Sequence, residues 1–140
     1  WTSGALINMD KIENDELGKF GMNLGLAFQI FDDIRDFTDI TNKTNKSGKN
    51  IGIDINNGIL TLPVILSLES NFENNPFYKS IKCKDEINVK DLSVYLIQEG
   101  FIQKATMIGN LYIEKAINNL KHFKPNEITS ILLEIANSIK

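Results

Sequence analysis

The nine residues Phe28–Asp36 constrain the fold and chemistry of this chain more than any other stretch. They place three carboxylates, Asp32, Asp33 and Asp36, directly after a stretch whose apolar side chains recur every three or four positions. That spacing predicts an amphipathic helix. On a helix, Asp32 and Asp36 lie on one face, one turn apart, where two unpaired acids repel. A cation between them would remove the repulsion, and Mg²⁺ takes oxygen ligands from one or two carboxylates together with water and substrate phosphates.

The acidic run has a plainer interpretation as a solvated turn at a helix end, because charge runs are usually solvated. Two features favour a functional role. The i, i+4 line through Leu24 and Phe28 leads into the acids, so we expect the acids to extend the apolar stripe of the helix. The acids also fall late in the helix, where the macrodipole disfavours negative charge. Acidic residues at positions where they destabilise the helix usually serve a function.

Periodicity, caps and breakers predict an all-α chain without an alternating strand pattern. The longest helix is expected to begin near Asn14 or Asp15 and to run to about Phe37. Other helices are expected over residues 3–9, from Thr61 to 69, from Asp91 to Gly100, over 101–123 and from Asn126 to 140, with polar connections at 39–58 and 70–90. The helix after Thr61 is nearly apolar all round, so we expect it to be buried.

Three glycines, Gly18, Gly21 and Gly25, lie inside the longest predicted helix. Each costs about 1 kcal/mol relative to alanine in a helix. We therefore expect another helix or a ligand to approach that side of the helix closely.

Length, charge and cysteine content bound the class of protein. The 140 residues suffice for one modest core. A net charge of −3 with scattered basic residues argues against a nucleic-acid partner. The single cysteine, Cys83, permits no internal disulfide and fits a reducing compartment, so we expect a cytoplasmic protein, with an organelle as the alternative. Because Trp1 opens what looks like the middle of a helix, we expect a C-terminal piece of a longer protein.

Four motifs follow one another along the first half of the chain. They are Phe28-Gln29-x-x-Asp32-Asp33-x-x-Asp36, Gly48-Lys49, Asp54 and Thr61-Leu62-Pro63. This ordered set resembles the second aspartate-rich motif and the following loop of the trans-isoprenyl diphosphate synthases, the polyprenyl synthetases. The resemblance covers nearly the whole chain. It implies that residues 1–140 are the C-terminal part of one isoprenoid-synthase-type helical bundle, without the half that carries the first aspartate-rich motif.

The resemblance also implies an activity. Family members ionise an allylic diphosphate with the help of Mg²⁺, isopentenyl diphosphate attacks the allylic cation, and a proton is lost. The implied partners are these two diphosphates and a second subunit, in a homodimer or a heterodimer. Because this chain holds only half of such a metal site, we expect the 140 residues alone to be inactive.

Roles for the acids follow from the same resemblance. Asp32 would bind Mg²⁺ directly, and Asp36 would bind the metal or its water shell. Asp33 would act from further out in catalysis, since it points about 100° away from Asp32 around the helix. Asp54 would anchor the loop or reach the metal shell.

Three further residues are implied to contact substrate. Lys49 would hold the allylic diphosphate, and its alternative is an ordinary solvated lysine. Gln29 would bond the reacting face, and its alternative is a polar residue of the core. Phe28 would line a prenyl channel, and its alternative is packing within the bundle.

Other functions stay open. The principal alternative is a non-catalytic partner subunit of a heteromeric synthase, and a plain helical interaction domain with surface acids is another. A terpene cyclase of the same helical class would need Ser or Thr four residues after Asp32 and Glu four further on, where this chain has Asp36 and Ile40. The chain also departs from the synthases at Ile59, where many members carry a lysine that contacts phosphate.

Overall fold

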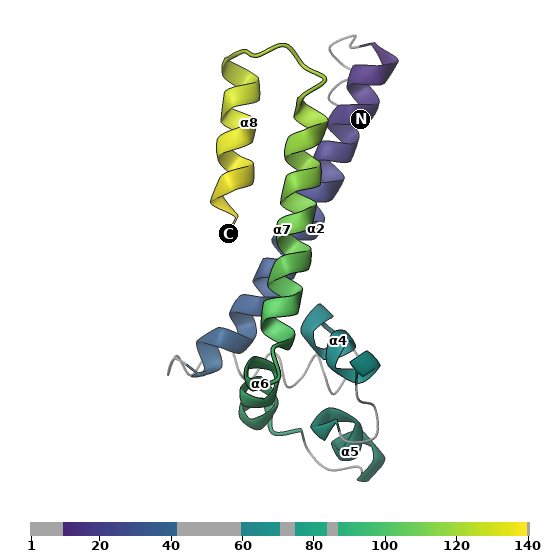
Figure 1. Ribbon diagram of the computed structural model, residues 1–140, viewed down its shortest axis with the longest axis vertical. Helices are drawn as coiled ribbons and strands as arrows, with labels where there is room; N and C mark the ends of the chain where they lie inside the picture. Colours follow the sequence, from purple (N-terminus) through teal and green to yellow (C-terminus); the bar gives the residue numbers. More distant parts are fainter. Residues whose placement is uncertain (1–9, 42–59, 71–74, 84–86, 140) are drawn as a thin grey trace. The chain divides into compact units, whose positions relative to one another are not determined.

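Figure 1 shows the computed structural model, which describes residues 10–41, 60–70, 75–83 and 87–139. These residues contain six helices and no strand, which confirms the predicted all-α fold. The helices are α2 (Lys11–Thr41), α4 (Leu62–Ser70), α5 (Pro76–Cys83), α6 (Val89–Gln98), α7 (Phe101–Leu120) and α8 (Glu127–Ser138). No described helix has both the length and the apolar character that crossing a bilayer demands.

The chain divides into two compact units, and α2 and α7 each contribute to both. The first unit combines residues 1–31 with 108–140, and the second comprises residues 32–107. In the first unit, α8 (yellow) lies beside α7 (green), and α2 (purple) packs on α7 (Figure 1). Its core consists of Phe20, Ala116, Leu120 and Ala136, none more than 4% exposed. Because these residues come from three helices, residues distant in sequence share this core.

A polar network joins α2 to α7 beside this core. The Glu16 carboxylate accepts hydrogen bonds from Lys19 Nζ at 2.6 Å and from Asn119 Nδ2 at 2.7 Å. Asn119 Oδ1 accepts a further bond from Asn23 Nδ2 at 3.0 Å, and His122 Nε2 lies 3.7 Å from Glu16 Oε2. The side chain of Glu16 is only 12% exposed, so these partners satisfy an acid that would otherwise be costly to bury.

The second unit is built around side chains from α4, α5 and α6. Val64, Phe77 and Leu96 are at most 2% exposed. Asn75 and Ser67 are buried with them, and Asn75 Nδ2 donates a 2.8 Å hydrogen bond to Ser67 Oγ. A buried polar group without a partner is destabilising, and this bond avoids that for both side chains.

Two helices begin earlier than predicted because a better cap lies upstream. α2 begins at Lys11, where the carboxylate of Asp10 accepts a 2.8 Å bond from the backbone N–H of Glu13. α6 begins at Val89, and Asn88 Oδ1 accepts hydrogen bonds from the backbone N–H groups of Lys90 and Asp91. Both Asp and Asn are strong N-caps, so the expected starts at Asn14 or Asp15 and at Asp91 were wrong.

The prediction of a polar connection over 70–90 was also wrong, because α5 lies within it. Asn75 Oδ1 accepts a 2.9 Å bond from the backbone N–H of Phe77, and Pro76 takes the first helical position. Asparagine followed by proline is as typical of a helix start as of a turn. Here the chain forms a helix, and the apolar residue after the proline, Phe77, is buried.

The helix after Thr61 differs from its prediction in two respects. Thr61 Oγ1 has no hydrogen-bond partner among the described residues, so the expected side-chain cap is not formed. Only one face of α4 is buried, with Pro63 and Val64 inside and Ile65 37% exposed. Two other predictions are confirmed: Asn126 caps α8 in a capping box, and Gly100 follows α6 with φ +77°, which favours glycine.

Candidate metal and diphosphate site

The acids of α2 lie away from its packed side. Its buried positions include Ala27, Ile30 and Ile34, whereas Phe28 is 55% exposed and the Asp32 side chain 50% exposed. The expected continuation of the apolar stripe into the acids was therefore wrong. Each i, i+4 step turns about 40° around the helix, so the line that starts at the buried Phe20 has rotated by about 120° when it reaches Asp32.

Asp32 is accessible to a cation. Within the described residues its ion pair is with Arg35, at 3.5 Å between Oδ1 and NH1, and both side chains are at least half exposed. Exposed pairs of this length contribute little and are easily exchanged. A harder, doubly charged ion would therefore compete well with the guanidinium for this carboxylate.

The charge around Asp32 favours cation binding. The stretch from Asp32 to Asp39 carries four carboxylates and one guanidinium, and α2 has no basic residue in its last turn. The negative end of the helix dipole adds to this field. Oxygen donors from acids one turn apart, Asp32 and Asp36, suit Mg²⁺, which needs only one or two carboxylates when a phosphate is present.

The described residues supply a partial set of metal ligands. Among them, no group of three His, Cys, Asp or Glu side chains comes close enough to hold an ion. Asp32 and Asp36 thus fit one side of a Mg²⁺ site in their chemistry. The remaining ligands would come from phosphate, water or other protein groups.

The proposed substrate contacts Gln29 and Phe28 are both exposed on α2. Neither side chain therefore belongs to the core of the described residues, and the alternatives that place Gln29 in a core and Phe28 in the packing of the bundle stay untested. Phe20 by contrast is 4% exposed and belongs to the core. The roles of Gln29 and Phe28 as substrate contacts stay predictions.

Two glycines of α2 face open space on the same side as Phe28 and Asp32. A Cβ at Gly21 or at Gly25 would meet no atom of the described structure within 4 Å. The expected close approach to these glycines is therefore not found within the described residues. Counted at 100° per residue, Gly21, Gly25, Phe28 and Asp32 fall within about 60° of one another around the helix.

The loop residues of the motif lie outside the described structure. Lys49 and Asp54 belong to residues 42–59, as does Ile59. Their implied roles in holding the diphosphate and in anchoring the loop stay predictions.

A close contact directly before Asp32 was not anticipated from the sequence. A Cβ at the buried Gly109 of α7 would lie 2.9 Å from Phe31 Cε2 and 3.3 Å from Ile30 Cγ2. The signal available in the sequence was the pair Ala105 and Gly109, two small residues four apart in an otherwise amphipathic helix. Such spacing lets two helices approach closely.

Comparison with known proteins identifies related sequences. Residues 2–98 match the family model described as polyprenyl synthetase. A prenyl transferase of Cyanidium caldarium is 34% identical over 94% of this chain and 39% of its own length. Solanesyl diphosphate synthase 1, chloroplastic, of Arabidopsis thaliana is 35% identical over 86% of this chain and 29% of its own length. The all-trans-polyprenyl-diphosphate synthase PDSS1 of Mus musculus is 25% identical over 93% of this chain and 31% of its own length. The chain therefore spans about a third of the length of these relatives. No solved structure matches it.

Proposed function

Because the chain belongs to the polyprenyl synthetase family, we propose that it is the part of a trans-isoprenyl diphosphate synthase that carries the second aspartate-rich motif. The proposed reaction condenses isopentenyl diphosphate with an allylic diphosphate. The carbon–oxygen bond of the allylic diphosphate breaks, isopentenyl diphosphate attacks the resulting cation, and a proton is lost to give the elongated diphosphate.

In this proposal Asp32 and Asp36 hold Mg²⁺ against the allylic diphosphate. When bound, the ion would neutralise the charge that builds on the leaving diphosphate. Lys49 would contact the same diphosphate, and Gln29 would bond the reacting end of the substrate from one turn before Asp32. Asp33 would support the site from further out, through its charge.

The observation that carries the proposal is the order of exposed residues along α2, which the helical repeat places toward one side. Gly21 and Gly25 leave this face without side chains, Phe28 adds an apolar surface, and Asp32 follows one turn later. A diphosphate with an isoprenoid tail has the same order of an anionic head and a narrow apolar chain. Gly21 and Gly25, which no described contact explains, thereby receive a role in admitting the tail.

The direct test uses the complete gene product with Mg²⁺, isopentenyl diphosphate and allylic primers of several lengths. Products are sized by mass spectrometry. We expect elongated diphosphates from the wild type, a loss of about a hundredfold or more in the Asp32→Asn variant, and wild-type rates in Asp91→Asn. Asp91 is a matched control because it is an exposed aspartate of a helix outside the motif. Absence of product from the wild type would favour the non-catalytic partner subunit.

Two further properties belong to the same proposal. The synthase is expected to be a homodimer or a heterodimer, which light scattering on the purified gene product would determine. Its compartment is expected to be the cytoplasm, with an organelle as the alternative because the Arabidopsis relative is named as chloroplastic. Imaging of a C-terminal fluorescent fusion of the complete gene product would distinguish the two compartments.

A further inference from the structure

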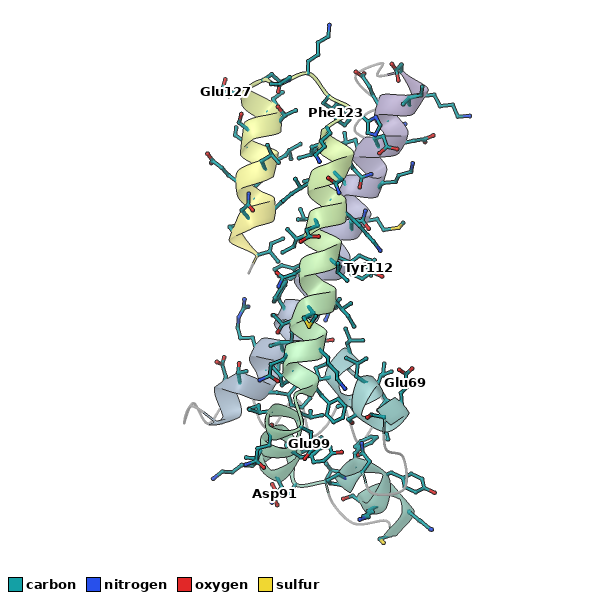
Figure 2. All side chains as sticks on the ribbon, in the orientation of Figure 1. Glu69, Asp91, Glu99, Tyr112, Phe123 and Glu127 are labelled. Atoms are coloured by element: carbon teal, nitrogen blue, oxygen red, sulfur yellow. The ribbon has the colours of Figure 1, made fainter. Side chains whose placement is uncertain are left out.

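Gly109 provides a notch in α7 for the ring of Phe31. An added Cβ would lie 2.9 Å from Phe31 Cε2 and 3.0 Å from Cζ, and 3.3 Å from Ile30 Cγ2. Contacts below 3.0 Å are shorter than packed carbon atoms allow, since carbon pairs are most stable at about 3.5–4.0 Å. A methyl group at this point would therefore force the ring of Phe31 to shift, which glycine avoids. Tyr112, labelled on α7 in Figure 2, lies three residues after the notch.

Other buried positions of α7 have room for a side chain. Ala105 and Ala116 are fully buried, and each carries the methyl group that Gly109 lacks. A glycine inside a helix destabilises it by about 1 kcal/mol relative to alanine. The glycine at position 109 therefore has a specific reason, and that reason is the ring of Phe31.

The notch lies immediately before the proposed metal ligand. Phe31 precedes Asp32 in the chain, and both belong to α2. Successive residues of a helix point about 100° apart, so the ring packs against α7 while the carboxylate points to a different side. A displacement of the Phe31 backbone would therefore be passed directly to Asp32.

We propose that Gly109 is a positioning residue for Asp32. It seats Phe31 and Ile30 against α7 and thereby fixes the turn of α2 that presents the carboxylate. This inference rests on the proposed function. Functional side chains must be held to within about 0.5 Å of their productive geometry. A methyl group at position 109 would press on the side chains of Phe31 and Ile30, the two residues directly before Asp32.

The test compares three variants of the complete gene product with the wild type: Gly109→Ala, Phe31→Leu and the double variant. Two measurements are made on each. The first is Mg²⁺-dependent binding of an allylic thiodiphosphate, a probe that ionises poorly, followed by calorimetry. The second is the dependence of turnover on Mg²⁺, with the KM for isopentenyl diphosphate measured at saturating Mg²⁺.

We expect Gly109→Ala to weaken Mg²⁺-dependent binding about tenfold, the low end of what loss of support behind a metal ligand causes. The KM for isopentenyl diphosphate should not change. The double variant should recover most of the Mg²⁺ affinity, because leucine lacks the ring atoms that meet the new methyl group. Phe31→Leu alone removes ring atoms from the notch without creating a clash, so it should weaken Mg²⁺-dependent binding less than Gly109→Ala does.

Thermal unfolding of the same variants separates positioning from stability. A lower melting temperature in Gly109→Ala with unchanged Mg²⁺ affinity would overturn the inference, as would a double variant that does not recover. If the wild type elongates primers and Gly109→Ala behaves identically, the role of Gly109 is wrong and the proposed function stands. If the wild type neither elongates primers nor binds the probe with Mg²⁺, the proposed function is wrong and the inference falls with it.

Discussion

Asn119 Nδ2 donates a 2.7 Å hydrogen bond to Glu16 Oε2 and so joins α7 to α2. The bond holds an acid whose side chain is 12% exposed. The hydrogen bond from Lys19, and after it the bond from Asn119, lowers the pKa of the Glu16 carboxyl below its usual value of 4.5. The same ion pair raises the pKa of Lys19. The ionised form of Glu16 is therefore the form that the fold favours.

This relationship predicts a dependence of stability on pH. Because the pKa of Glu16 is lower in the folded state than in the unfolded chain, its contribution is fully present above about pH 4.5 and is lost as the pH falls through the folded-state pKa. Melting temperatures of the wild type and Glu16→Gln should differ near neutral pH, with the wild type higher. The difference should narrow below about pH 4.5. Glu134→Gln, which changes an exposed acid of α8, serves as the control, and an equal effect from it would contradict the prediction.

Removal of the Asn75 side chain should destabilise the second unit. Asn75 is fully buried, bonds Ser67 and caps α5 through the backbone N–H of Phe77. Asn75→Ala loses the cap and leaves the Ser67 hydroxyl with one partner fewer, so we expect a loss of about 2 kcal/mol in the free energy of unfolding. Asn88→Ala removes an exposed cap of α6 and should cost about 1 kcal/mol or less. Denaturant titration measures both, and an equal loss would show that burial adds nothing at Asn75.

Substitution of Gly25 should separate stability from activity. An added methyl group meets no described atom within 4 Å, and alanine favours the helix by up to about 1 kcal/mol. Thermal unfolding of Gly25→Ala should therefore show equal or higher stability. If the exposed face of α2 borders the substrate tail, elongation by the complete gene product should fall about tenfold or more. Wild-type elongation in this variant would remove the role proposed for this face.

The 140 residues alone should not elongate a prenyl primer. The described part of the chain contains no group of three potential ligands close enough to hold a metal, and the proposed mechanism needs ligands beyond Asp32 and Asp36. Purified residues 1–140 should give no elongated product with Mg²⁺, isopentenyl diphosphate and an allylic primer, under conditions in which the complete gene product does. Detectable turnover by the isolated 140 residues would refute this expectation.

The all-α fold and the end of α6 at Gly100 were predictable because apolar periodicity and helix caps are local signals. The starts of α2 and α6 were predicted too late because several polar residues competed for each cap, and only tertiary packing selects among them. The helix α5 was missed because Asn75-Pro76 is also typical of a turn. Its burial against Ser67 depends on contacts between segments, which periodicity does not contain.

For the candidate site, the sequence identified the acids but not the side of the helix on which they lie. The i, i+4 line appeared to connect Leu24 and Phe28 with the core, whereas Phe28 is exposed. The reason is the accumulated rotation of about 40° per step, which a short motif conceals. The pair Ala105 and Gly109 indicated that another helix could approach α7 closely, but the partner, Phe31, is far away in sequence and no local pattern identifies it.

The two-sided nature of α2 has a consequence for how this sequence can change in length. Phe20 and Ala27 are buried, and the acids begin five residues after Ala27 on the same uninterrupted helix. One residue inserted between Ala27 and Asp32 would turn every acid by about 100° around the helix axis relative to the buried residues that precede it on α2. Substitutions along this helix can be absorbed one position at a time, whereas an insertion or deletion would redirect the whole motif at once.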